Sequence, residues 1–137
     1  MGLHTTTSQH LADLLTGTNT RLLIVGGAGS LYLDKEHKVQ LVDAPDFPDA
    51  YKPVANGMAA ALAELRKRTD VKWTYVSPAA DFQADGARTG KYILGGEEFH
   101  TNGKGKSVIS YADYAIAMVD EIEKGSHVQE RISVVAE

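Results

Sequence analysis

The chain has 137 residues, 43% of them hydrophobic and 23% charged, which is ordinary for one globular domain with its own core. Its 14 basic and 18 acidic residues give a net charge of −4, which argues against a nucleic-acid-binding surface because phosphate contacts need a basic face. The absence of cysteine excludes disulfides and thiolate chemistry and suits a cytoplasmic location, and no apolar run approaches the roughly 20 residues of a membrane span.

The first predicted helix covers about residues 8–16. Residues 6–9 have the spacing of a capping box, and Gly17 is suited to end the helix in a left-handed turn. The apolar positions at helical spacing are Leu11, Leu14 and Leu15. Residues 21–25 predict a strand, and the continuous apolar run of residues 22–25 within it favours a buried strand of a parallel sheet.

A small hairpin is predicted next, with strands at residues 31–33 and 39–42 on either side of a polar stretch. Residues 43–48 follow as a loop that two prolines stiffen. Pro53 fits the first turn of a longer helix. The apolar stripe predicted for that helix consists of Val54, Met58, Ala61, Leu62 and Leu65.

Residues 73–76 predict a second buried strand, and the glycine-rich segment after it is expected to hold short strands at residues 91–94 and 97–100. Ser110 predicts the start of a last helix, with the Asp113 side chain accepting from the Ser110 backbone. The expected core face of that helix is Ala115, Ile116, Val119 and Ile122. Gly125 would end the helix, and residues 131–135 form a final strand.

Strands that alternate with helices predict an α/β fold with a mainly parallel sheet, as one domain over residues 1–137. Ligands of such sheets bind beyond the carboxyl ends of the strands. Two loops occupy those ends here, residues 26–30 and residues 77–80. We therefore expect a ligand site between these loops.

The glycines of the first loop do not make a dinucleotide fingerprint. Tyr32 stands where the third glycine belongs, no helix follows, and Asp43 sits in a proline loop rather than at a strand end. The structural alternative is a tight turn in which glycine supplies a positive φ. The loop is thus not expected to bind a pyrophosphate.

Five segments in order resemble the NADH-flavin reductase-like group of atypical short-chain dehydrogenases, which are NmrA-like NAD(P)-binding proteins. The segments are RLLIVGGAGSLYL, DFPDAYKP, WTYVSPAADF, RTGKYILGG and ISYADYAIAMVDEIE. The resemblance implies a Rossmann-like sheet and an NAD(P)H-dependent oxidoreductase. It further implies NADP or NAD as the cofactor and a small-molecule substrate, either a flavin (FMN or FAD) or a quinone-like ring.

The same resemblance assigns the residues of the site. The positions near the nicotinamide would be Gly27, Ala28 and Ser30, facing Ser77, Pro78 and Ala79 across the pocket. Tyr51, with Lys52 beside it, matches a region near the substrate. Phe82 either covers a flat ring or is a core aromatic residue.

Members of the family begin with a strand and a GxxGxxG loop that anchors the pyrophosphate. The present sequence contains no such segment. The chain matches the C-terminal portion only, so it is expected either to be truncated or to have lost that anchor. The alternative to a reductase is a non-enzymatic NmrA-like nucleotide sensor or an inactive remnant. Apolar surface left open by missing strands would favour a homodimer.

Two side chains are candidates for catalysis. Ser30 either bonds a nicotinamide amide or substrate carbonyl, or caps local backbone. Tyr51 is a candidate acid, although the lysine spaced four residues on in short-chain dehydrogenases is replaced by Ala55. The five histidines form no paired motif, so no metal site is expected and each is interpreted as a surface residue.

Overall fold

The computed structural model describes residues 2–137, with side chains from residue 4 onward. Its main sheet has the strand order β1-β2-β6-β4. These strands are β1 (Arg21–Val25), β2 (Lys72–Ser77), β6 (Glu130–Ala136) and β4 (Tyr92–Gly95). The first three run parallel and β4 runs antiparallel to β6. The predicted mainly parallel α/β sheet is therefore confirmed.

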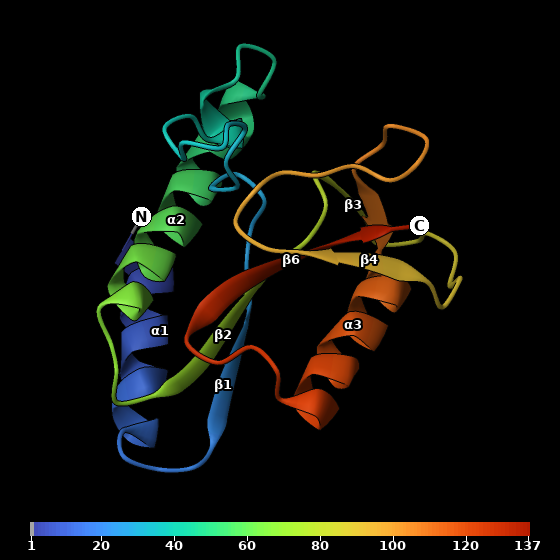
Figure 1. The fold of residues 1–137 in the computed structure, drawn as a ribbon. Helices are drawn as coiled ribbons and strands as arrows, with labels where there is room; N and C mark the ends of the chain where they lie inside the picture. Colours follow the sequence, from blue (N-terminus) through green and yellow to red (C-terminus); the bar gives the residue numbers. More distant parts are fainter. Residues whose placement is uncertain (1) are drawn as a thin grey trace.

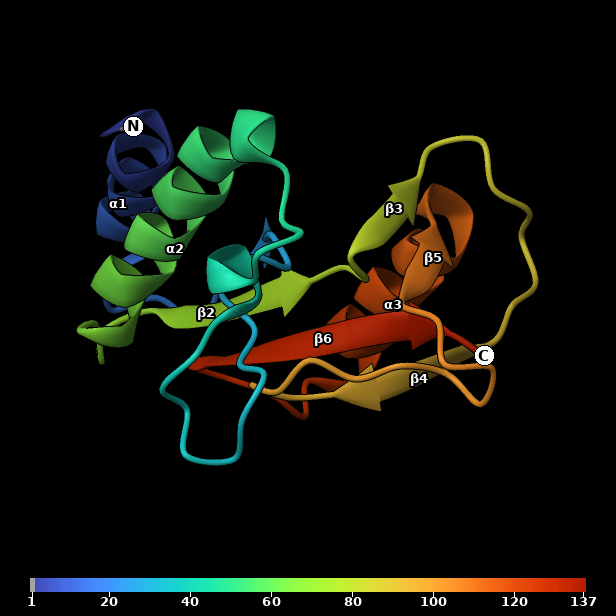
Figure 2. The same ribbon diagram turned by 90° about the horizontal axis from the view of Figure 1, so that it is seen from above.

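Helices cover both faces of this sheet (Figures 1 and 2). Helices α1 (Gly2–Leu15) and α2 (Lys52–Arg66) lie side by side against one face, and α3 (Tyr111–Lys124) lies against the other. Alternate side chains of β2 point to opposite faces of the sheet. Trp73 and Tyr75 pack with α1 and α2, while Val76 packs with α3. A second sheet of two short parallel strands, β3 (Asp81–Gln83) and β5 (Val108–Ser110), borders α3 (Figure 2).

The predicted helix ends are largely confirmed. Gly17 and Gly125 adopt left-handed φ angles of 72° and 59°, which a residue with a Cβ adopts at a cost. Ser110 caps α3 by accepting a hydrogen bond from the Asp113 amide at 3.0 Å. The prediction that the Asp113 side chain accepts a hydrogen bond from the Ser110 backbone is wrong, because that carboxylate accepts from Thr89 and Gly90 instead.

Two predicted helix faces are wrong. The first helix begins near Gly2, so the expected capping segment lies inside it, and its buried residues are Ser8 and Ala12 rather than Leu11 and Leu14. In α3 the buried residues are Asp113, Tyr114, Ala117 and Glu121. Val119 and Ile122, predicted as core, are 50% and 58% exposed.

Two predicted strand regions are shorter than expected. The hairpin of residues 31–42 is present only as one antiparallel bridge, Tyr32 to Gln40, with backbone bonds from Leu33 to Val39 at 2.8 Å and from Leu41 to Leu31 at 2.9 Å. The Asp34 carboxylate accepts from the Lys38 and Val39 amides at the tip, where the ladder ends. Two 3₁₀ turns follow, η1 (Leu41–Asp43) and η2 (Asp49–Tyr51). Residues 97–100 form one bridge rather than a strand.

Within residues 2–137, no helix combines the length and the apolar character needed to cross a bilayer.

Candidate functional site

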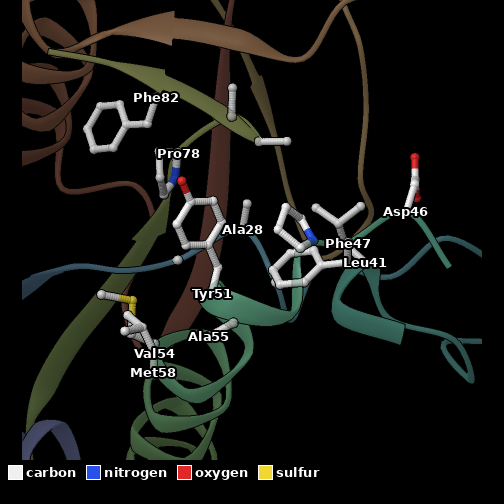
Figure 3. A pocket seen from close by; sticks show the side chains of 15 residues that line it. Ala28, Leu41, Asp46, Phe47, Tyr51, Val54, Ala55, Met58, Pro78 and Phe82 are labelled. Atoms are coloured by element: carbon white, nitrogen blue, oxygen red, sulfur yellow. The ribbon is translucent and has the colours of Figure 1, made fainter. Parts of the chain in front are cut away.

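A cavity of about 460 Å³ lies at the carboxyl ends of β1 and β2 (Figure 3). Residues 27–29, directly after β1, form its floor, and residues 78–80 after β2 form one wall with Phe82. The opposite wall comes from the first turns of α2 and the loop before it. The residues of that wall are Leu41, Asp46, Phe47, Pro48, Tyr51, Val54, Ala55 and Met58. The two loops predicted to meet at the sheet edge thus border one cavity.

The glycines of the floor allow close packing rather than a left-handed turn. A Cβ on Gly27 would lie 2.9 Å from the Met58 sulfur, and one on Gly29 would lie 2.8 Å from the Ala55 Cβ. A Cβ on Gly26 would overlap the Tyr75 ring. None of these three glycines has a positive φ, so the expected positive φ is wrong. The floor therefore needs glycine because helix α2 and Tyr75 approach it so closely.

Hydrogen bonds from β2 hold the floor in place. The Gly27 amide donates to Tyr75 Oη at 3.0 Å, and this hydroxyl donates to the Met58 carbonyl at 3.3 Å. The Ser77 hydroxyl donates to the Gly27 carbonyl at 2.6 Å. Burial raises the pKa of Tyr75, so the phenol stays neutral and keeps both bonds.

Arg131 joins the two loops from below. It is buried, and one of its terminal nitrogens donates to the Ser30 hydroxyl at 2.9 Å and the Ser77 hydroxyl at 3.1 Å. Its other terminal nitrogen donates to the Ser30 carbonyl at 3.0 Å, and its Nε donates to Glu97 at 3.0 Å. Glu97 also accepts two bonds from Arg66, at 2.6 and 2.9 Å. This network fixes the loops relative to β6.

The charge of Glu97 is stabilised by this arrangement. Burial alone would raise the pKa of Glu97, but the hydrogen bond from Arg66 and the charge of Arg131 outweigh burial and lower it. Desolvation lowers the pKa of Arg131, and Glu97 acts against that shift. Both groups stay ionised at neutral pH, so the network persists there.

The structure brings most of the predicted site residues together. Those that line the cavity are Gly27, Ala28, Tyr51, Pro78, Ala79 and Phe82. Ser30 and Ser77 do not line it, because their hydroxyls are buried beneath the floor and bonded to Arg131 and Gly27. These two serines join the loops beneath the cavity, and their predicted contact with a ligand stays a prediction.

The candidate acid Tyr51 lies in the wall of the cavity. It precedes the first residue of α2, is 65% exposed, and extends toward Pro78 (Figure 3). The Lys52 ammonium is 2.9 Å from the Asp49 carboxylate, so its charge is already paired. Phe82 also packs against Tyr111 and Tyr114, with ring centroids 4.3 and 4.9 Å apart, so it is both a core residue and a cavity residue.

Two features of the site were missed from the sequence. The loop of residues 41–48 supplies a wall, and the available signal was Phe47, an aromatic residue between two prolines. Arg131 holds the floor, and the signal was a cation in an otherwise apolar strand. Neither signal identifies a partner, because the partners lie far away in the sequence.

The lining of the cavity suits a flat ring better than a charged group or a metal ion. Among residues 2–137, no three His, Cys, Asp or Glu side chains are grouped to hold a metal. The expectation of solvated histidines fails for His127, whose ring is half-buried and lies 2.7 Å from Glu121. A flat nicotinamide fits the apolar cavity, but a pyrophosphate does not fit, because no Lys, Arg or His lines it and no helix begins at Gly29.

Known proteins match nearly the whole chain. The Bacillus subtilis (strain 168) protein YwnB, described as uncharacterized, is 45% identical over 136 residues, which are 98% of this chain and 64% of YwnB. A crystal structure of a candidate NADH-flavin reductase from Streptococcus pneumoniae TIGR4 is 54% identical, with a TM-score of 0.96 over 98% of this chain and 64% of that chain. A candidate exported protein from Burkholderia pseudomallei is 38% identical, with a TM-score of 0.87 over 96% and 63%.

The chain thus spans just under two thirds of the length of these proteins. No family model matches it. More distant solved structures, 16–24% identical with TM-scores of 0.52–0.84, share its fold. The arrangement is Rossmann-like.

Proposed function

We infer that this chain, a relative of the NADH-flavin reductase-like proteins with a Rossmann-like fold, supplies the nicotinamide and substrate side of an NAD(P)H-dependent oxidoreductase. The observation that carries the inference is the apolar cavity at the carboxyl ends of two adjacent parallel strands, where this fold class binds its ligands. The substrate would be a flavin or a quinone-like ring, and a cytoplasmic location belongs to the same proposal.

The chain's own residues would hold two flat rings together and keep water away from them. Nicotinamide supplies the hydride when it is bound, so the protein contributes position and environment. Phe47, Pro78 and Phe82 offer flat apolar surfaces to these rings, and residues 27–29 form the floor beneath them. Tyr51 Oη can donate a hydrogen bond to an oxygen of the substrate at the mouth of the cavity.

The proposal predicts binding that depends on the nicotinamide half of the cofactor. Because no cation lines the cavity, reduced nicotinamide mononucleotide should bind within about threefold of the affinity for NADH. The measurement is a titration of the ¹⁵N-labelled chain by NMR, following the amides of residues 27–29. Ala28→Phe should fill the cavity and abolish the shifts, while Ala115→Phe, on the exposed side of α3, should leave them unchanged.

Three results would decide against this assignment. A folded chain that binds neither nucleotide, or binding that survives Ala28→Phe, would remove the site from this cavity. NADH bound more than about tenfold tighter than the mononucleotide would show that the chain also holds the pyrophosphate. Nucleotide binding with no turnover of flavins or quinones would favour the non-enzymatic sensor.

A further inference from the structure

The lining of the cavity is mostly apolar and carries one acidic side chain and no basic one. Eight of its lining residues are large apolar or aromatic side chains or prolines, and the remainder are small residues apart from Asp46. Asp46 is the single lining residue with a side chain that is charged at neutral pH, and it is exposed at the rim beyond Phe47 (Figure 3). A ligand in this cavity thus meets apolar surface and one negative charge.

The nearby cations are already committed to other partners. Lys52 pairs with Asp49, and Arg66 makes two bonds to Glu97. Arg131 lies under the floor, and all three of its nitrogens donate to Ser30, Ser77 or Glu97. No Lys, Arg or His side chain lines the cavity, so an anionic group inside it meets no cation there.

The cavity lining should bind anionic, neutral and cationic rings with different affinities. An ionised sulfonate, carboxylate or phosphate on a ring would lose water in the apolar cavity without gaining a partner, which opposes binding. Asp46 would add repulsion at the rim, weakened by solvent and salt because the side chain is exposed. A neutral ring carries neither cost, and a cationic substituent near the rim would be attracted.

We propose that the cavity selects neutral or cationic planar rings over anionic ones, with Asp46 as the residue that sets this preference at the rim. This rests on the proposed function for the identity of the site, and it narrows the substrate class to uncharged quinones and to flavin rings whose phosphate stays outside. The selectivity is a property of ring binding alone and needs no hydride transfer.

The test uses a matched set of three-ring quinones and no nucleotide. Calorimetry on the full 137-residue chain would compare 2-(hydroxymethyl)anthraquinone, 2-(aminomethyl)anthraquinone and anthraquinone-2-sulfonate. The neutral and cationic compounds should bind at least about tenfold tighter than the sulfonate at low salt. Asp46→Asn should improve sulfonate binding by about two- to fivefold, and added salt should shrink that gain.

A control separates a local effect from net charge. Glu123→Gln removes one negative charge from the exposed side of α3 and should change sulfonate binding by less than about twofold. Equal gains from both variants, sulfonate affinity equal to that of the neutral ring, or no binding of the neutral ring would overturn the proposal. A chain that prefers the neutral ring over the sulfonate but does not bind nicotinamide nucleotides would instead count against the proposed reductase.

Discussion

Arg131 shows at the scale of one residue how the sheet supports the cavity. Its guanidinium is buried and joins Ser30 after β1, Ser77 at the end of β2 and Glu97 after β4. Sequence reasoning found both serines, placing Ser77 near the ligand and leaving Ser30 open between ligand contact and capping of local backbone. It could not find their partner, because Ser30 and Arg131 are 101 residues apart and no local pattern encodes that pairing.

Arg131→Met tests this role. The change leaves the buried hydroxyls of Ser30 and Ser77 without their donor and Glu97 with one cation, so the free energy of unfolding should fall by about 3 kcal/mol. Urea unfolding followed by circular dichroism measures it. Arg88→Met, at an exposed position, should stay within about 0.5 kcal/mol of the parent. Equal losses from both variants would contradict a special role for Arg131.

At the scale of elements, α3 is anchored at both ends by buried carboxylates. Asp113 accepts from Thr89 and Gly90, and Glu121 accepts from Arg21 and His127. Burial would raise the pKa of each carboxyl, but these hydrogen bonds outweigh it and lower both pKa values. The helix is therefore attached to β1 and to the loop before β4 through charge.

These lowered pKa values predict acid sensitivity. The unfolded chain takes up protons near the ordinary values of 3.8 and 4.5, before the folded chain does, so stability is full above about pH 5 and falls as the pH drops through these values. Urea midpoints between pH 7 and pH 3 measure this. Asp113→Asn should cost about 2 kcal/mol at pH 7 and flatten the profile.

The exposed Asp85→Asn is the comparison for that experiment, since its carboxylate is solvated. It should keep both the stability and the pH profile of the parent. A pH profile of Asp113→Asn that runs parallel to the parent's would contradict the assignment of the acid sensitivity to α3.

The elements that sequence predicted well are those whose local pattern and tertiary role agree. The strand at residues 73–76 is buried between two helical layers, and the strand at residues 21–25 contains the apolar run of residues 22–25 although only Leu22 is buried, so composition indicates both. The hairpin at residues 31–42 is reduced to one antiparallel bridge, because Asp34 side-chain bonds to the Lys38 and Val39 amides take over at its tip. The faces of α1 and α3 failed because which side of a helix is buried depends on what lies beside it.

At the scale of the whole molecule, one side of the sheet remains incompletely covered. β1 is at the sheet edge among residues 2–137, and its Val25 is 54% exposed. Val119 and Ile122 of α3, on the same side of the sheet, are also exposed. The ordered motifs still predicted the relationship correctly, since the NADH-flavin reductase-like resemblance is confirmed.

The expected homodimer stays a prediction, and this exposed apolar side gives it a test. Sedimentation of the 137-residue chain should show concentration-dependent self-association. Ile122→Lys should weaken it about tenfold or more, because a lysine charge would be buried at the contact. Leu11→Lys, on the opposite face, should not weaken it. A monomer at every concentration would contradict the prediction.

The floor and the outer wall of the cavity differ in how freely they can diverge. Gly27 and Gly29 admit no side chain without displacing Met58 or Ala55, so any variant there disturbs α2. The wall at residues 46–48 sits on a loop whose side chains are exposed or half-buried, outside the sheet. Substitutions in residues 46–48 could therefore change the substrate during evolution while Gly27 and Gly29 stay the same.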